Sequence, residues 1–242
     1  MDFYPTDLAD VFTSLCHCPP SSSSVLFLNT DSSLIPLTLQ GASESLITVN
    51  VDDPNIGNGL VRNLGAHFDD IASRIHVTTS RDRSNDDEFD TTNNEYYDDI
   101  DELEMFTHDS ILTDVPSTND RVSLNEMSLD NVFHPIHTHT RQSFPMEQKK
   151  ILKKAIQLCR PGGYVTYTSC TMSHLQNEYC VQSAVKELLM DYQITVRSVP
   201  LHLVSFALPE VATYDHSKLG QLVLPRLGQN YGPRYICKLL IE

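Results

Sequence analysis

The stretch Arg160-Pro-Gly-Gly-Tyr-Val-Thr-Tyr-Thr-Ser-Cys-Thr171 decides the fold. Pro161 and the two glycines after it predict the end of a helix and a tight turn. Residues 164–168 are β-branched and aromatic, a composition typical of a buried strand. The strand delivers Cys170 just past its carboxyl end, and ligands bind at that edge of an open α/β sheet. Cys170 is therefore a candidate nucleophile, with a buried structural thiol as the alternative interpretation.

The composition is that of a globular chain with one strongly acidic segment. Hydrophobic residues make up 40% of the 242 residues, enough for a sizeable core, and no apolar run approaches the length of a membrane span. The net charge is −15, of which residues 82–104 contribute −10 through eleven acidic residues and one arginine. This charge argues against general binding of polyanions, although the rest of the surface could carry a local basic patch.

The order of predicted elements indicates one α/β domain. Helices are expected at residues 7–16, 34–39, 56–67, 146–158 and 175–190, and strands at 25–28, 46–51, 75–79, 110–115, 164–168, 192–199, 221–224 and 234–241. This alternation predicts a mostly parallel, doubly wound sheet with an antiparallel edge at the last two strands. We place an N-terminal segment at 1–24, the domain at 25–242, and a flexible, solvated acidic insert at 83–104.

The cysteines and the N-terminal residues bear on the compartment. Six scattered cysteines do not form a disulfide framework, so reduced thiols are expected. Residues 1–24 contain no Lys or Arg, so they predict neither a secretory signal nor an Arg-rich transit peptide. Either the compartment needs no such signal or the chain starts downstream of it.

Two groups of residues have the side chains of metal ligands without a convincing spacing. Cys16-His-Cys18 lacks a second matching pair. His134, His137 and His139 lie in the long connection 117–145, where solvated histidines are the favoured interpretation. We predict no metal site.

Two neighbouring strand ends carry groups capable of chemistry. Asp114-Val-Pro-Ser117 ends the fourth strand, and Thr168-Ser-Cys-Thr171 ends the fifth. The ends of such strands converge in a doubly wound sheet. A thiolate can add to a heteroaromatic ring while a carboxylate holds a protonated ring nitrogen or an exocyclic amine. The pair Cys170 and Asp114 therefore predicts chemistry on a base-like ring.

These motifs and their order resemble the Nol/Nop/Sun RNA cytosine-5 methyltransferases, and most closely the mitochondrial member that works on ribosomal RNA. The matching strings cover roughly the C-terminal half of the chain: Asp114-Val-Pro-Ser-Thr-Asn-Asp-Arg121 with Ser123-Leu124, Pro161-Gly-Gly163, Ser173-His-Leu-Gln-Asn-Glu-Tyr179, residues 222–225, and Tyr231-Gly-Pro233. The resemblance implies a Rossmann-like methyltransferase fold that uses S-adenosyl-L-methionine.

The resemblance also implies roles for three residues at the two strand ends. Cys170 matches the nucleophile that adds to C6 of cytosine before C5 takes the methyl group. Asp114 matches the acid that borders the cofactor and contacts the base. Ser117 stands where the family has a second cysteine that assists product release. A serine hydroxyl is a weak substitute, because it is essentially un-ionised at neutral pH.

The cofactor side departs from the family pattern. The family's first strand runs into Cys-Ala-Ala-Pro-Gly-Gly-Lys-Thr, where this chain has Asn29-Thr-Asp-Ser-Ser-Leu-Ile-Pro36. Ser33-Leu34 replaces the two glycines and Ile35 replaces the lysine, although close approach of the backbone to a cofactor favours glycine. Asp52 and Asp82 match the acids beside the ribose and the adenine. With Asn29 and Asp114 they form the predicted cofactor contacts.

The positions expected to contact the base match the family, whereas several of those expected to contact the cofactor do not. We therefore predict weak or absent binding of S-adenosylmethionine. We expect an RNA-binding, methyltransferase-derived factor in mitochondrial ribosome assembly, with weak or lost catalysis and a location in the matrix. The resemblance implies ribosomal RNA, an assembly intermediate and an mTERF-type helical-repeat protein as partners. The alternative is an active rRNA cytosine-5 methyltransferase. Six basic residues are the candidate RNA contacts: Arg121, Arg141, Lys149, Lys150, Lys153 and Lys154.

Overall fold

The structure is a computed structural model, and it describes residues 8–20, 23–28, 34–41, 44–51, 54–66, 71–79, 107–125, 131–209, 211–214, 219–225 and 231–242. The predicted acidic insert at 83–104 lies outside these residues, as do Asn29, Asp52 and Asp82. The predictions for them therefore stay predictions.

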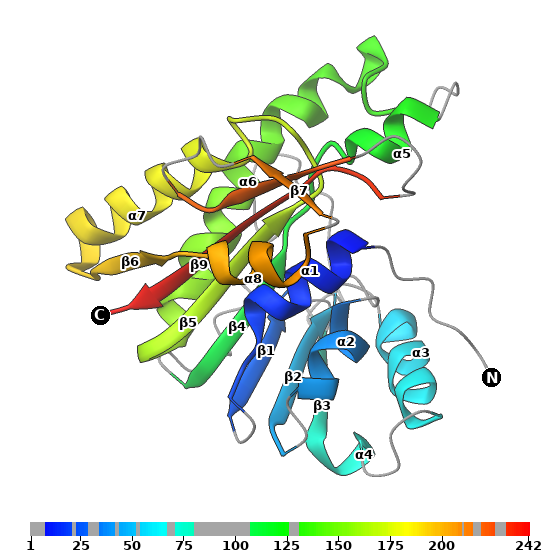
Figure 1. Ribbon diagram of the computed structural model, residues 1–242, viewed down its shortest axis with the longest axis vertical. Coiled ribbons are helices and arrows are strands. Elements are labelled where there is room, and N and C mark those ends of the chain that lie inside the picture. The colour runs from blue at the N-terminus through cyan, green and yellow to red at the C-terminus, as the bar shows by residue number, and fades with distance from the viewer. Residues whose placement is uncertain are drawn as a thin grey trace, which may run out of the picture.

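Within the described residues, nine strands form one mixed sheet in the order β3-β2-β1-β4-β5-β9-β8-β7, with β6 also paired to β9 (Figure 1). The strands are β1 (Ser24–Leu28), β2 (Leu46–Val51), β3 (Ile75–Thr79), β4 (His108–Asp114), β5 (Cys159–Ser169), β6 (Val196–Val199), β7 (Ala212–Tyr214), β8 (Gln221–Leu224) and β9 (Arg234–Ile241). The pairs from β3 to β5 are parallel, and β9 is antiparallel to β5, β6 and β8. The Rossmann-like fold is confirmed, with a larger antiparallel part than the sequence predicts because β6 and β7 join it.

Helices cover both faces of the sheet (Figure 1). They are α1 (Leu8–His17), α2 (Leu34–Gly41), α3 (Pro54–Gly65), α4 (Ile71–Arg74), α5 (Asp120–Asn125), the 3-10 helix η2 (Pro135–His137), α6 (Thr138–Leu158), α7 (Glu178–Tyr192) and α8 (His202–Ala207). Helices α6 and α7 pack in one apolar cluster against β4, β5 and β9, whereas α2 and α3 pack in a second cluster against β1 and β2. A third cluster seats α1 against β8 and β9. Of the helices described, none is long and apolar enough to span a membrane.

Helix α6 starts earlier than the sequence predicts. The sequence places its start at Met146, because Pro145 is expected to end the preceding connection, yet the helix begins at Thr138 and contains Pro145. The guanidinium of Arg141 donates to the carbonyls of Val132 and His134 at 2.6 and 3.0 Å, and so holds the turn before the helix. The connection 117–145 also contains α5 and η2, so it is not a plain loop.

The Pro-Gly-Gly stretch forms a bulge inside β5 and not a turn before it. Helix α6 ends at Leu158, and β5 already begins at Cys159, with a shift of register opposite His108 and Ser110. Gly162 has a φ of 82°, which favours glycine. A Cβ on Gly163 would lie 2.7 Å from the carbonyl oxygen of Asp109, so a side chain does not fit there.

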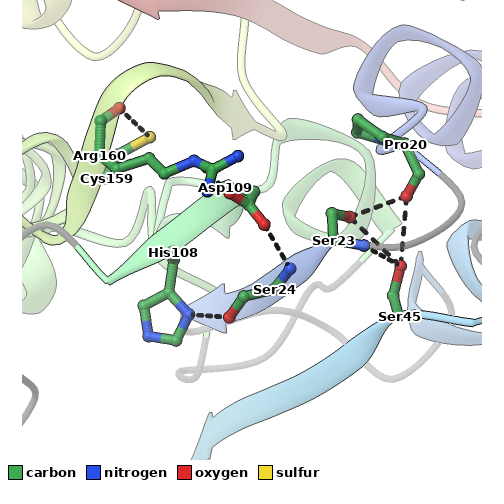
Figure 2. A network of polar contacts seen from close by, with 8 residues as sticks. All are labelled: Pro20, Ser23, Ser24, Ser45, His108, Asp109, Cys159 and Arg160. Atoms are coloured by element: carbon green, nitrogen blue, oxygen red, sulfur yellow. Dashed lines mark hydrogen bonds and ion pairs between the residues drawn. The ribbon is translucent and has the colours of Figure 1, made fainter.

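A polar network fixes the amino ends of the central strands (Figure 2). The Asp109 carboxylate accepts from the backbone N–H of Ser24 at 2.7 Å and pairs with the Arg160 guanidinium. The Ser24 hydroxyl lies 2.9 Å from Nδ1 of His108. Burial lowers the pKa of His108 from its ordinary value, although the charge of Asp109 raises it. This network joins β1, β4 and β5 at the edge opposite the one where Cys170 lies.

Candidate functional site

The carboxyl ends of β4 and β5 bring Asp114 and Cys170 to one edge of the sheet. Asp114 is the last residue of β4 and pairs in register with Thr168 of β5. The backbone N–H of Val115 donates to the Thr168 carbonyl at 3.0 Å, which extends the pairing by one residue. Cys170 follows the end of β5 directly and is partly exposed. The structure thus places both predicted residues where the strand order requires.

Ser117 lies directly beside Cys170. Its hydroxyl oxygen accepts a hydrogen bond from the backbone N–H of Cys170 at 3.1 Å. On the other side, the carbonyl of Cys170 accepts from the backbone N–H of Asp120 at 3.1 Å. The loop after β4 therefore holds the backbone of Cys170 from both sides. The three predicted base-side residues therefore lie at adjoining strand ends: Asp114 is the last residue of β4, and Ser117 and Cys170 lie in the loops that follow β4 and β5.

Asp120 is the main connection between the two loops, and the sequence prediction missed it. Its Oδ1 accepts from the hydroxyls of Thr118 and Thr171 at 2.7 and 3.0 Å. Its Oδ2 accepts from the backbone N–H of Met172 at 2.8 Å. Hydrogen bonds to an ionised carboxylate are stronger than neutral ones. Asp120 thus limits how far the loop that carries Cys170 can move.

Buried amide side chains support the same loops from behind. The Gln148 amide on α6 donates to the Pro116 carbonyl at 2.7 Å and to Oε1 of Gln176 at 3.2 Å. That Oε1 also accepts from the backbone N–H of Thr118 at 3.2 Å. Asn177 donates to the Thr171 carbonyl at 2.9 Å. The segment from Ser173 to Tyr179, which resembles the family, therefore supplies two residues that hold the site in shape, Gln176 and Asn177.

Arg234 is a charged residue of the site that the sequence prediction also missed. It is the first residue of β9 and only 7% exposed. Its Nη1 donates to Oδ2 of Asp114 at 3.2 Å, and its Nη2 donates to Oδ1 of Asp10 at 2.7 Å. Burial alone lowers the pKa of Arg234, but the charges of Asp114, Cys170 and Asp10 outweigh burial and raise it. Arg234 is therefore a permanent cation within the electrostatic reach of Cys170.

A sequence signal for this pair exists, though it is weak. Arg234 is the one charged residue at the head of the otherwise apolar run Tyr235-Ile-Cys237, and Asp10 lies among the apolar residues of α1. Isolated charges in such positions are rarely buried unless they are paired.

Among the cysteines, exposure separates Cys170 from the buried thiols. Burial raises the pKa of four of them: Cys16 to about 12, Cys159 to about 12, Cys180 to about 11 and Cys237 to about 12. A buried thiol with a raised pKa is a poor nucleophile. Cys170 is partly exposed and Cys18 is exposed. The partial exposure of Cys170 contradicts the burial expected of a buried structural thiol, and its role as a nucleophile stays a prediction.

On the cofactor side, the described residues pack into the core. Leu34 and Ile35, which stand where the family has a glycine and a lysine, are fully buried at the start of α2. They belong to the same apolar cluster as Val25 and Phe27 of β1. The described part of this turn therefore lacks the glycine cradle and the lysine expected for S-adenosylmethionine. Asp114 is the one predicted cofactor contact that the structure describes.

The histidines of the long connection do not converge on a metal. His134 caps η2, with Nδ1 accepting from the backbone N–H of Ile136 at 3.4 Å. Of the residues that the structure describes, no group of three or more His, Cys, Asp or Glu side chains is placed to hold a metal ion.

No model of a known protein family matches the chain, but individual relatives do. The 5-cytosine rRNA methyltransferase NSUN4 of Mus musculus is 41% identical over 139 residues, which are 57% of this chain and 36% of that protein. The 5-cytosine rRNA methyltransferase nsun-4 of Caenorhabditis elegans is 37% identical over 56% of this chain and 30% of that protein. A mitochondrial tRNA (cytosine(34)-C(5))-methyltransferase of Danio rerio is 32% identical over 54% and 35%. The chain spans about a third of the length of the curated relatives that it matches.

Two solved structures share the fold at low sequence identity. The crystal structure of PH0851 matches with a TM-score of 0.64 and 13% identity over 98% of this chain and 46% of that chain. NSun6 of Pyrococcus horikoshii with SFG matches with a TM-score of 0.60 and 16% identity over 98% and 53%. The fold is that of the S-adenosylmethionine-dependent methyltransferases. Over about half of its length the chain is similar in sequence to RNA cytosine-5 methyltransferases, two of which are named as acting on rRNA, in agreement with the resemblance that the sequence predicts.

Proposed function

We propose that the chain is an RNA-binding factor, derived from the rRNA cytosine-5 methyltransferases, that acts in mitochondrial ribosome assembly with weak or lost catalysis. The observation that carries this proposal is the packing of side chains at the start of α2. There Leu34 and Ile35 are fully buried in the core, in the positions where the family has cofactor-binding glycine and lysine. A side chain committed to the core contributes no contact to a cofactor.

The base side supports a retained role in binding RNA. Hydrogen bonds of Asp120 and of the buried amides behind the site connect the ends of β4 and β5, where Asp114, Ser117 and Cys170 lie. A domain can keep its core and its partner surface after it has lost a ligand. The partners that we propose are ribosomal RNA, a ribosomal assembly intermediate in the mitochondrial matrix, and an mTERF-type helical-repeat protein. The family resemblance supports these partners, and the similarity to an rRNA methyltransferase supports the first of them.

An active rRNA cytosine-5 methyltransferase is the second candidate, and the partial exposure of Cys170 favours it. In that reaction Cys170 adds to C6 of cytosine while Asp114 holds the polarised base. S-adenosylmethionine, if bound, would supply the methyl group to C5, and Asp114 is the described residue that would border it. Loss of the C5 proton then expels the Cys170 thiolate and restores the aromatic ring.

Binding of S-adenosylmethionine to the purified chain separates the two candidates. We expect titration calorimetry to show no binding at micromolar affinity, which would require about 8 kcal/mol of binding free energy. NSUN4 of Mus musculus, titrated in the same buffer, is the positive control. A micromolar dissociation constant for this chain, together with transfer of a labelled methyl group to rRNA, would establish the methyltransferase and contradict our proposal. Binding of rRNA without either would support it.

A further inference from the structure

Arg234 and Cys170 are the next residues beyond the last pair in the ladder of β5 and β9. In the antiparallel ladder of β5 and β9, Thr168 pairs with Ile236 and Ser169 with Tyr235. The next pair in this register is Cys170 with Arg234. The Arg234 guanidinium also lies 3.5 Å from the hydroxyl of Thr168, so it turns toward the end of β5. Strand register and the contact with Thr168 thus place the cation at the end of β5, which Cys170 directly follows.

Four elements contribute charge around Cys170. Arg234 on β9 is the cation, and Asp114 at the end of β4 and Asp10 on α1 are its two partners. Asp120, at the start of α5, binds the residues just after Cys170. Arg121 follows Asp120 and packs against Gly232, and His174 lies on the exposed turn beyond Met172.

The Asp10–Arg234–Asp114 triad is almost closed to solvent, with side-chain exposures of 9%, 8% and 9%. Charges at this depth are screened less by salt than surface charges are. One guanidinium pairs with two carboxylates, so the triad has a net charge of −1. The charge that Cys170 experiences therefore depends on all three members.

We propose that Arg234 is a positioning residue for this site: it orients Asp114 and favours the thiolate form of Cys170, and Asp10 of helix α1 moderates that effect. The proposal rests on the proposed function insofar as it takes Cys170 to be the group that meets the RNA base. Through Asp10, helix α1 becomes part of the site and not only a cover for the sheet.

Two substitutions should shift the pH midpoint of Cys170 alkylation in opposite directions. Arg234→Gln removes the cation and leaves two carboxylates near the thiol, which disfavours the thiolate. Asp10→Asn removes one negative charge and keeps an amide oxygen that can accept from Arg234, which favours the thiolate. A substitution that acted only by loosening the fold would expose Cys170 and speed its reaction in both variants.

The test is the rate of alkylation of Cys170 by iodoacetamide between pH 6 and pH 10, measured peptide by peptide with mass spectrometry. For Arg234→Gln we expect the pH midpoint to rise by about one unit, which slows alkylation at neutral pH about tenfold. For Asp10→Asn we expect a lower midpoint and faster alkylation. Cys18 is the reference within the same molecule, because it lies near Lys238. Lys238 is four residues along β9 from Arg234, a distance of about 14 Å. The four buried cysteines report unfolding.

Arg197→Gln is the matched control, because it breaks an exposed ion pair of Arg197 with Glu242 and should leave the Cys170 profile unchanged. An unchanged profile in Arg234→Gln, or shifts of the same sign in both triad variants, would overturn the proposal. If Arg234→Gln exposes the buried cysteines, Asp10→Asn decides: its pH midpoint must fall while its buried cysteines stay unreactive, and any other result overturns the proposal as well. The measurement needs neither RNA nor cofactor, so failure of the proposed function would leave its result untouched.

Discussion

The carboxylate of Asp120 accepts a hydrogen bond from the Thr171 hydroxyl at 3.0 Å, and so binds the loop after β4 to the loop after β5. The second carboxylate oxygen accepts from the backbone N–H of Met172 at 2.8 Å. Cys170 immediately precedes these two residues, and its own carbonyl accepts from the backbone of Asp120. Asp120 is therefore the residue that fixes the distance between the two halves of the candidate site.

Replacement of Asp120 by alanine should destabilise the protein by about 2–4 kcal/mol, because each hydrogen bond to a charged group contributes about 1.5–3 kcal/mol and the loops partly relax. Urea unfolding followed by circular dichroism gives this free energy. Asp191→Ala is the control, since Asp191 is exposed on α7 and its loss should change stability by less than about 0.5 kcal/mol. Equal unfolding midpoints for the two variants would contradict the role of Asp120.

Any methyl transfer by this chain should require Cys170, because the thiolate is the attacking group. Cys170→Ala is expected to abolish incorporation of a labelled methyl group into rRNA.

Ser117→Cys should raise turnover by restoring the thiol that assists product release in the family. Ser117→Ala is its control, since it removes the hydroxyl that accepts from the Cys170 backbone without adding a thiol. Equal turnover in the wild type and Ser117→Cys would show that Ser117 does not limit the reaction.

The sequence predicts those parts of the fold whose signal is local. Strands β2, β3, β8 and β9 have the predicted bounds, because short β-branched and aliphatic runs between polar turns define them. The contact between Ser117 and Cys170 follows from strand order, which brings the ends of β4 and β5 together.

The parts that the sequence does not predict depend on contacts between distant residues. Asp10 and Arg234 are 224 residues apart, and no periodic pattern marks either as half of a buried ion pair. The early start of α6 is hidden by Pro145, which ordinarily ends a helix. Tertiary contacts of Arg141 stabilise the turn before it. Such contacts exist only once the chain has folded.

Glu187 bridges two of the lysines that are predicted to contact RNA. Its carboxylate accepts from Lys149 at 2.8 Å and from Lys153 at 3.0 Å. Hydrogen bonds from Lys149 and Lys153 lower the pKa of Glu187, so the bridge persists at neutral pH and is lost as the pH falls through that lowered pKa. The two lysines are thus partly neutralised on the surface of α6 and α7.

Glu187→Gln should tighten the binding of rRNA if this face contacts phosphate, because it removes a negative charge and releases two cations. The slope of affinity against salt should become steeper, since more phosphates are neutralised. Fluorescence anisotropy at several salt concentrations measures both quantities. Glu178→Gln, at the start of α7, is the control for a change of charge that leaves the two lysines paired. Unchanged affinity in Glu187→Gln would exclude this face as the RNA surface.

His17 is a fully buried base that makes folding sensitive to acid. Its Nδ1 lies 3.0 Å from the Thr166 hydroxyl and its Nε2 lies 3.4 Å from that of Ser110. Burial, helped by the charge of Lys238, lowers the pKa of His17 from 6.5 to about 3. The unfolded chain therefore takes up a proton at a higher pH than the folded protein does.

The stability that depends on neutral His17 is fully present above pH 6.5 and is lost as the pH falls from 6.5 toward 3. By pH 5 the loss should be about 2 kcal/mol, since each pH unit below the unfolded pKa costs about 1.4 kcal/mol. In His17→Gln, the fall in unfolding free energy between pH 7.5 and pH 5 should be smaller than in the wild type by that amount. His202→Gln, at an exposed position, should fall as the wild type does. If His17→Gln loses as much stability as the wild type over this interval, other groups cause the acid sensitivity and not His17.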